Sequence, residues 1–440
     1  MRRQRPEAMR VMRYRGVLLA GASFCVACGH EPSGAVGEDP PPDTVDSSHL
    51  PVMPGLAGFG VQTPAGRRGA VIRVTNLNDA GAGSLRAALA ARGARTILFE
   101  AGGTIALAST LRIDHPYVTI AGQTAPAPGV TLRGATLSIR AHDVLLQHVR
   151  VRPGDGTPRT DAIQILGPNG YNVVLDHVSA SWGTDENIGT SGSGAHDIAI
   201  ANSISSEGLA AYQSAGLLVF DGSKNVTIVG SLFAHNSDRN PYFKGNTSGV
   251  FANNVVYNWD VEGAYHADPD GSGPSLISIV GNVFITGPNT AGPSMRIFAT
   301  AKPGTRVYVG DNSRNDAPPP ENAWSLVADD AGDRVIAAEA PVWPAGLVAL
   351  PNGLVRSMVL AAAGAWPASR DEVDARVVED VRTRAGGIVR TQAEVGGWPD
   401  LGAPQHYLTL PVNPNGDDDR DGYTNLEEWL HLLAARAEGR

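Results

Sequence analysis

The sequence predicts an all-β protein that folds as a parallel β-helix with short capping helices. Short β-branched runs recur at a regular interval, turn-forming residues separate them, and an asparagine follows several of the runs. The composition agrees, because 52 glycines and 31 prolines accompany only 18% charged residues in a chain of 440. That balance favours many short strands and is atypical of helix bundles.

The repeated runs are the main element of this prediction. Successive runs lie roughly 25 to 29 residues apart, the spacing of a solenoid whose repeats stack on their neighbours. They are too short for helices, and β-branched residues favour stacked, pleated strands. The runs occupy residues 118–120, 144–146, 173–175, 198–200, 226–228, 250–251 and 276–279.

The asparagines after the runs are expected to form a hydrogen-bonded ladder through the turns of successive coils. They are Asn202, Asn253, Asn282 and Asn312. A β-propeller would need a repeat of about 40 residues, and a β-sandwich would show clearer alternation and hairpin turns. Neither pattern appears.

Few segments predict helices. Residues 84–91 (SLRAALAA) predict a short helix that caps the first coil. Ser369 and Glu372 have the spacing of a capping box before a second helix, which Gly386 and Gly387 would end. The region 313–368 predicts irregular excursions around the coils.

The first 28 residues predict a targeting segment, in which arginines precede an apolar stretch (16–27) too short to span a bilayer. Cys28 ends a lipoprotein-like box, so an outer-membrane lipid anchor and simple cleavage with secretion both remain open. Cys25 and Cys28 are the two cysteines of the chain, so the mature protein is expected to have no internal disulfide.

The domain organisation follows from composition. Residues 29–50 lack lysine and arginine and predict a flexible linker. A β-helix domain (51–410) and a tail (411–440) complete the predicted arrangement, and we expect a monomer. The net charge of −9 argues against nucleic acid as a partner.

Several ordered motifs resemble bacterial family 1 polysaccharide lyases, the pectate lyases. They are GFG (58–60), VTNLNDAGAGSLRAAL (74–89), IAGQTAPAPGVTL (120–132), VRVRPGD (149–155), LDHVSASWGTDEN (175–187), AHNSDRNP (234–241), NNVVYNW (253–259), VDARVVEDV (373–381) and EVGGWP (394–399). The resemblance implies a right-handed parallel β-helix. It also implies cleavage of polygalacturonate by β-elimination, in which a base removes the proton on C5 and a divalent cation neutralises the adjacent carboxylate.

The resemblance also suggests roles for individual residues. Arg239, two residues before Pro241, matches the family's catalytic base, and Lys244 matches a substrate-binding residue. Because a guanidinium gives up its proton only in strongly basic water, an alkaline optimum is expected. The non-catalytic alternative for Arg239 is an ion pair with a surface carboxylate. The alternative for Lys244 is an ordinary solvated lysine.

Calcium is the cofactor that the resemblance implies, since hard carboxylate oxygens suit it. Asp161 and Asp185 are the candidate ligands, with Glu186 beside them, whereas Asp176 has a signature position that also suits a structural role. In each case the alternative is a turn residue bonded to its own backbone. The sequence departs from the family pattern at one place. Relatives carry a lysine in the stretch that corresponds to residues 208–215, which contains no basic residue here. Gln213, the candidate sugar ligand there, cannot neutralise a carboxylate.

The histidines of the repeats, His148, His177, His196 and His235, do not have the spacing of a zinc site. They are predicted to be structural, with His177 the strongest exception because it belongs to the LDH signature.

The tail contains a second candidate calcium site with the pattern of a twelve-residue EF-hand loop. An exiting helix is predicted over 427–437, no helix enters the loop, and a solvated acidic tail is the alternative. The candidate ligands are Asp417, Asp419, Asp421, the carbonyl of Tyr423, Asn425 and Glu428.

Three functions therefore remain at this stage. The first is a calcium-dependent pectate lyase or a lyase for methylated pectin. The second is a β-helix glycoside hydrolase, which needs a pair of acids that the motifs do not supply. The third is a non-catalytic polysaccharide-binding protein, which the missing lysine favours.

Overall fold

The computed structural model describes residues 50–156, 159–260, 265–267, 272–297, 302–329 and 335–440, all within one compact unit, Asp39–Arg440. The predicted targeting segment with Cys28 lies outside the described residues, as does all but the last residue of the predicted linker (29–50). No helix in the described part of the chain is long and apolar enough to cross a bilayer.

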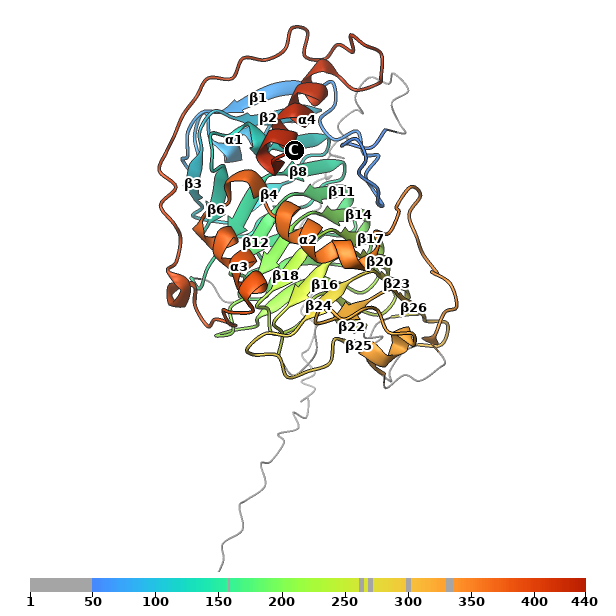
Figure 1. The fold of residues 1–440 in the computed structure, drawn as a ribbon. Helices are drawn as coiled ribbons and strands as arrows, with labels where there is room; N and C mark the ends of the chain where they lie inside the picture. The colour runs from blue at the N-terminus through green and yellow to red at the C-terminus, as the bar shows by residue number, and fades with distance from the viewer. Residues whose placement is uncertain (1–49, 157–158, 261–264, 268–271, 298–301, 330–334) are drawn as a thin grey trace, which may run out of the picture. The chain divides into compact units, whose positions relative to one another are not determined.

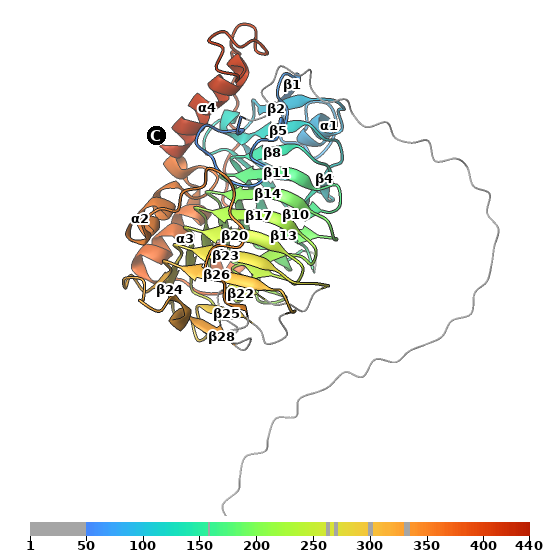
Figure 2. The ribbon, with the colours of Figure 1, turned by 90° about the vertical axis from the view of Figure 1, so that its right-hand side faces the viewer.

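Three parallel sheets form the body of the described chain (Figures 1 and 2). The first sheet contains β1 (Ala70–Val74), β2 (Arg95–Phe99), β5 (Val118–Ala121), β8 (Val144–Gln147), β11 (Tyr171–Asp176), β14 (His196–Ala201), β17 (Lys224–Val229), β20 (Ser248–Ala252), β23 (Leu276–Val280) and β26 (Arg306–Gly310). The second contains β3 (Gly103–Ala106), β6 (Val130–Arg133), β9 (Val149–Arg152), β12 (Ser179–Ser181), β15 (Ile204–Ser206), β18 (Leu232–Ala234), β21 (Val255–Tyr257), β24 (Val283–Ile285) and β27 (Ser313–Arg314). The third contains β4 (Leu111–Ile113), β7 (Leu137–Ile139), β10 (Ile163–Leu166), β13 (Glu186–Ser191), β16 (Ala215–Val219), β19 (Tyr242–Phe243), β22 (Tyr265–Ala267), β25 (Met295–Ile297) and β28 (Val327–Asp329).

The chain visits the first, second and third sheets in turn, so each circuit is one coil. Every predicted run lies in the first sheet, and strands of successive coils pair in parallel, for example Val118 with Val144 and Val144 with Val173. The prediction of a parallel β-helix is confirmed. Its right-handed winding agrees with the strong preference of crossovers between parallel strands.

The core is the interior of the coils. Buried aliphatic and aromatic side chains pile along the stack without interruption, from Val74 in β1 to Val309 in β26. Because strand side chains alternate in direction, the intervening residues face outwards. These outward positions are available to build a binding surface.

The asparagine ladder exists, but its register differs by one residue from the prediction in two coils. Ser231 N donates to Asn254 Oδ1, Asn254 N to Asn282 Oδ1 and Asn282 N to Asn312 Oδ1, each at 2.9 Å. Asn202 and Asn253 precede the ladder and have left-handed backbone, with φ of 48° and 53°. In those coils one left-handed residue makes the turn, and the next residue points into the ladder.

The helices correct two predictions. Helix α1 (Leu85–Leu89) begins after Ser84 and buries Leu85 and Leu89 in the core, as residues 84–91 predicted. Helix α2 (Asn352–Ala362) lies within the region expected to be irregular; it buries Val355 and Val359 against the outer side chains of the second sheet. Its pattern is apolar every three or four residues, but neighbouring prolines and alanines obscure it.

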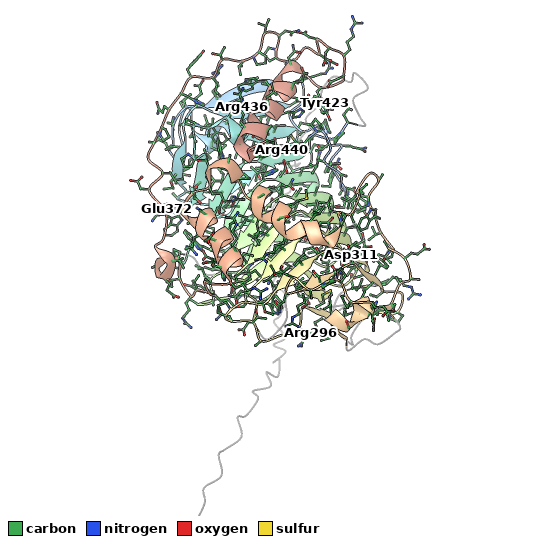
Figure 3. All side chains as sticks on the ribbon, viewed as in Figure 1. Arg296, Asp311, Glu372, Tyr423, Arg436 and Arg440 are labelled. Carbon is green, nitrogen blue, oxygen red and sulfur yellow. The ribbon has the colours of Figure 1, made fainter. Side chains whose placement is uncertain are left out.

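Helix α3 (Glu372–Thr383) starts two residues later than predicted. Asp371, not Ser369, is the capping residue, and its side chain accepts from Asp374 N. Helix α4 (Asn425–Glu438) follows Thr424, and Tyr423 and Arg440 mark its two ends in Figure 3. Helices α2, α3 and α4 lie along one side of the coils (Figure 2).

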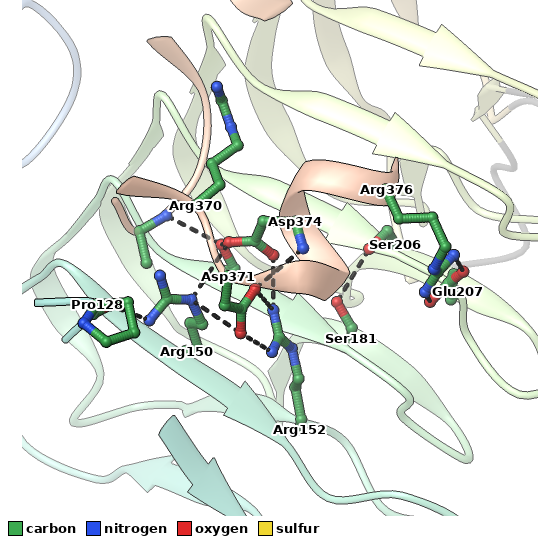
Figure 4. Close-up of polar contacts among 12 residues, drawn as sticks. Pro128, Arg150, Arg152, Ser181, Ser206, Glu207, Arg370, Asp371, Asp374 and Arg376 are labelled. Carbon is green, nitrogen blue, oxygen red and sulfur yellow. Dashed lines mark hydrogen bonds and ion pairs between the residues drawn. The ribbon is translucent and has the colours of Figure 1, made fainter. Parts of the chain in front are cut away.

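A buried ionic network attaches α3 to the second sheet (Figure 4). Arg152 forms ion pairs with both Asp371 and Asp374, and its Nη2 lies 2.7 Å from Asp374 Oδ1. Arg150 Nε lies 3.4 Å from each carboxylate. All four side chains are almost completely buried.

Candidate functional site

The predicted site residues gather where the chain enters four neighbouring strands of the third sheet. Asp161 precedes β10, Glu186 begins β13, Gln213 precedes β16 and Arg239 precedes β19. Parallel register places these entries side by side, since Glu186 pairs with Ala215 and Ala215 in turn bridges Asp238. Residues far apart in the chain thus meet on one edge.

Asp161, Asp185 and Glu186 form a carboxylate cluster, in which one oxygen from each lies within 4.8 Å of the others. The backbone N of Glu186 donates to Asp161 Oδ1 at 3.2 Å, which holds the Asp161 carboxylate beside the start of β13. Gln164 Nε2 donates to Asp161 Oδ2 at 3.3 Å. Gly189 packs beside them, since an added Cβ there would be in van der Waals contact with Asp161 Oδ2 at 3.4 Å.

The electrostatics of this cluster favour a bound cation. Burial raises the pKa of Glu186 to about 8, repulsion from Asp161 adds to this effect, and Arg239 opposes it. Burial also raises the pKa of Asp161, aided by Asp185. Buried carboxylates this close to one another suit a hard divalent ion such as calcium, which takes six to eight oxygen ligands. The residues present therefore fit that ion.

Arg239 faces the cluster. Its guanidinium forms an ion pair with Glu186, lies 3.9 Å from Asp238 and sits 5.6 Å from the ring centroid of Tyr242. With the Gln213 amide turned so that its oxygen faces the guanidinium, that oxygen accepts from Nη2 at 2.5 Å and from Nη1 at 3.1 Å. Arg239 is 21% exposed, so the guanidinium is oriented yet accessible to a polymer.

A buried asparagine network supports this edge, and the sequence analysis missed it. Asn236 Oδ1 accepts from Asn187 Nδ2 at 3.0 Å and from Gly208 N at 2.9 Å. Asn236 Nδ2 donates to Asn240 Oδ1 at 2.9 Å. The network links Asn187 and Asn240, the neighbours of Glu186 and Arg239, to Gly208. The signal available was the pair of asparagines flanking Arg239 within the AHNSDRNP motif.

Lys244 and Asp176, the remaining candidates outside the tail, have different surroundings. Lys244 follows β19, and its Nζ lies 5.0 Å from the ring centroid of Phe220. Asp176 ends β11 in the first sheet, where its carboxylate accepts from Asn202 and Gln147 at 3.0 Å each. The structure gives Asp176 a buried scaffolding position.

The tail brings three predicted ligands together, since Asp417, Asp419 and Asp421 each place one oxygen within 4.8 Å of the others. Gly422 has a φ of +98°, and its N donates to Asp417 Oδ2 at 3.2 Å. In the described part of the chain, Asp417 Oδ1 is buried without a hydrogen-bond partner.

The other tail candidates surround the start of α4. Burial and the nearby aspartates raise the pKa of Glu428. Asn425 is the first residue of α4, and its Oδ1 accepts from Asp418 N at 3.2 Å, which closes the loop. The Tyr423 hydroxyl donates to Pro51 O at 2.8 Å and ties the loop to residues near the start of the described chain.

No family model matches the chain. Curated relatives do match: the "Probable pectate lyase C" of Aspergillus flavus is 34% identical over 411 residues, covering 88% of this chain and 95% of the relative. The protein of the same name from Neosartorya fischeri is 34% identical over 408 residues, covering 87% and 94%.

Solved structures share the fold at low identity. A Bacillus subtilis pectate lyase mutant has a TM-score of 0.53 at 15% identity and covers 72% of this chain and 98% of its own. A pectate lyase bound to a hexasaccharide has a TM-score of 0.53 at 16% identity, covering 73% and 99%. The cedar pollen allergen Jun a 1 has a TM-score of 0.52 at 19% identity, covering 69% and 91%.

Proposed function

The chain belongs to the pectate lyase family, and we propose that it cleaves (1→4)-α-D-galacturonan by calcium-assisted β-elimination with Arg239 as the base. It is a polysaccharide lyase. The observation that carries the residue assignment is the arrangement of three acidic side chains and one arginine on adjacent coils, all at one edge of the third sheet.

Asp161, Asp185 and Glu186 are the residues that would hold calcium at this edge of the third sheet. Calcium supplies a Lewis acid that neutralises the substrate carboxylate and makes the neighbouring C5 proton more acidic. The raised pKa of Glu186 supports this assignment, because a divalent ion replaces the proton that otherwise relieves the repulsion.

Arg239 is the residue that would take the C5 proton. Glu186 and the Gln213 oxygen hold its guanidinium at this edge of the third sheet. Lys244, five residues further along the chain, would bind a second substrate carboxylate. The 21% exposure of Arg239 supports direct contact with the sugar ring.

The tail is proposed as a second calcium site with a stabilising role. Asp417, Asp419 and Asp421 would supply side-chain oxygens, Tyr423 its carbonyl, and Asn425 and Glu428 the remaining ligands. The buried, unpartnered Asp417 Oδ1 supports a cation there.

We also propose that the protein is secreted and acts on polysaccharide outside the cell as a monomer. The arginine-rich, apolar first 28 residues support export. Lipidation of Cys28 would keep the enzyme at the outer membrane, and the lipoprotein-like box supports that variant of the proposal.

The test is elimination itself, because only β-elimination produces an unsaturated uronate that absorbs in the ultraviolet. The protein is incubated with polygalacturonate in alkaline buffer, with calcium or with chelator. We expect product only with calcium, and a loss of at least about a hundredfold in kcat for Arg239→Ala. Arg382→Ala, at an exposed position on α3, is the matched control and is expected to retain full activity.

The absence of the family lysine near Gln213 keeps two other outcomes in view. Product from methylated pectin alone would indicate an altered substrate. No product from either polymer, with retention on immobilised polygalacturonate, would contradict the catalytic assignment and indicate a binding protein.

A further inference from the structure

A second group of buried ionisable side chains lies apart from the acidic cluster and Arg239. We call His148, His177 and Glu438 the His–Glu cluster. His148 and His177 are the left-handed turn residues that join the first and second sheets in successive coils. Their rings stack with centroids 5.2 Å apart. Glu438 is the last residue of α4, a helix at the far end of the sequence.

Two acceptor atoms face each other in this cluster. His148 Nδ1 lies 2.7 Å from Ala365 O, a carbonyl that can only accept, so Nδ1 carries the proton and Nε2 carries a lone pair. That Nε2 lies 3.7 Å from Glu438 Oε1. Both atoms are buried without a hydrogen-bond partner in the described part of the chain. Burial and the adjacent His177 lower the pKa of His148 to about 3, which keeps its ring neutral.

His177 is the third side chain of the cluster, and it also faces Glu438 Oε1. Its Nδ1 lies 3.7 Å from the same Glu438 oxygen and 2.9 Å from Asp176 Oδ1. The second Glu438 oxygen lies 2.6 Å from both Nε and Nη2 of Arg440, which orients the carboxylate. Asp176 contacts the same Nδ1, so a metal bound at that nitrogen would replace this hydrogen bond and would lie beside the Asp176 carboxylate.

We propose that His148 Nε2, His177 Nδ1 and Glu438 Oε1 bind a divalent transition metal of the zinc class. Imidazole nitrogens suit zinc and its neighbours, whereas calcium takes oxygen ligands. Tetrahedral zinc with bonds of about 2.0 Å holds its ligands about 3.3 Å apart. The two 3.7 Å separations to Glu438 would shorten by a few tenths of an ångström, and the two imidazole nitrogens, which lie within 4.8 Å of each other, would move together on binding.

The charges also balance. A dication beside the carboxylates of Glu438 and Asp176, with two neutral imidazoles, gives a neutral buried group, which avoids the cost of an uncompensated buried charge. The metal takes the lone pair of His177 Nδ1, which requires the ring to carry its proton on Nε2. The proton that Nδ1 shares with Asp176 moves to Nε2 in a neutral ring, or leaves for solvent from an imidazolium.

The expected consequence is a clamp between the last turn of α4 and two coils. The acidic loop of the tail lies at the start of the same helix, so the two ends of α4 would be held by metals of different chemistry. The His–Glu cluster shares no residue with the proposed catalytic site, and this proposal does not depend on the lyase activity.

The test is zinc binding by the whole protein in buffer saturated with calcium. Metal content after extended incubation and desalting gives the stoichiometry, and the visible absorption of a cobalt-loaded sample reports nitrogen–oxygen coordination. We expect about one equivalent of zinc per chain, with a higher melting temperature that a zinc chelator reverses. Glu438→Gln and His148→Gln should each lose the bound zinc and the temperature shift.

His406→Gln is the matched control, because His406 Nε2 contacts only a backbone carbonyl, Thr124 O at 2.9 Å. The His406→Gln variant should bind zinc like the wild type. The melting temperature of each variant without zinc checks that it folds. No tightly bound zinc in the wild type would overturn the proposal and leave a shared proton between His148 and Glu438. Zinc retained by both variants would equally overturn it.

Discussion

Arg239 and Gln213 come from adjacent coils, and the amide of one orients the guanidinium of the other. A glutamine can accept from the guanidinium but cannot neutralise a sugar carboxylate. We therefore propose that Gln213 positions Arg239, the proposed base, as an alternative to the sugar contact that the sequence predicted. This distinction has separate kinetic consequences.

Replacing Gln213 by alanine should lower kcat by about tenfold to a hundredfold with little change in KM, because a hydrogen bond to a charged group contributes ~1.5–3 kcal/mol. Steady-state kinetics on polygalacturonate measures both constants. Tyr212→Phe, which removes only a 3.4 Å contact to Asp155 O, is the neighbouring control. A raised KM with unchanged kcat would instead identify Gln213 as a sugar ligand.

At the scale of elements, α3 is attached to the second sheet by charges that water hardly reaches. Burial opposes ionisation of Asp371, but Arg152 and Arg150 outweigh it and hold the pKa of Asp371 well below its usual range. The folded-state pKa is thus lower than the unfolded one. The associated stability is fully present above about pH 4, which is the unfolded-state pKa, and it declines progressively as the pH falls below that value towards the much lower folded-state pKa.

Asp371→Asn should therefore lower the free energy of unfolding by ~3–5 kcal/mol near neutral pH, since it leaves Arg152 with an incomplete buried pair. Urea unfolding near pH 7 and near pH 3 measures the loss, which should shrink at the acidic value. Glu379→Gln on the exposed face of α3 should change stability by no more than about 0.5 kcal/mol. An equal loss at both pH values would contradict the ionic explanation.

The acidic loop before α4 is the second element whose stability is expected to depend on solution conditions. Helix α4 packs Leu426 and Leu430 on Leu98 and Ala121 of the first coils. A loop that binds calcium should therefore strengthen the contact between the tail and these coils.

Calcium at a hundredfold excess over its dissociation constant should stabilise the protein by about 2.7 kcal/mol through this loop. Asp419→Asn should lose that part of the calcium-dependent rise in melting temperature while keeping its kcat at saturating calcium. Asp418→Asn, at a loop position without a predicted ligand role, should keep both. Identical calcium responses of the two variants would rule out the loop as the site.

At the scale of the whole described chain, the core is one continuous column of side chains. A cavity in a middle coil therefore removes contacts from the coils on both sides of it. Solenoid stability depends on such interfaces between neighbouring repeats.

Phe251→Ala, at a fully buried position in β20, should lower stability by ~3–5 kcal/mol. Val348→Ala, at a side chain that is 79% exposed, should change little. Denaturant unfolding followed by circular dichroism compares the two. A loss confined to a separate minor transition would indicate that the coils unfold independently.

The sequence by itself determined the repeat, the strands of the first sheet, α1, most of α3 and α4, and the acidic loop. Each of these is written in residues close together in the chain, through side-chain periodicity, turn formers or ligand spacing. The family motifs extended this to candidate site residues. Local pattern did not resolve which of two adjacent residues enters the ladder at Asn253, because a single left-handed turn residue decides it.

Only the tertiary structure decided which distant residues meet. Glu186 and Gln213 contact Arg239 because the coils stack in register, and α3 is held by arginines more than two hundred residues earlier in the chain. His148 and Glu438 likewise face each other only because α4 packs back over the first coils. The physical reason is that these contacts depend on the number of residues in each coil, which sets the register between neighbouring coils. Short-range sequence patterns do not encode that register.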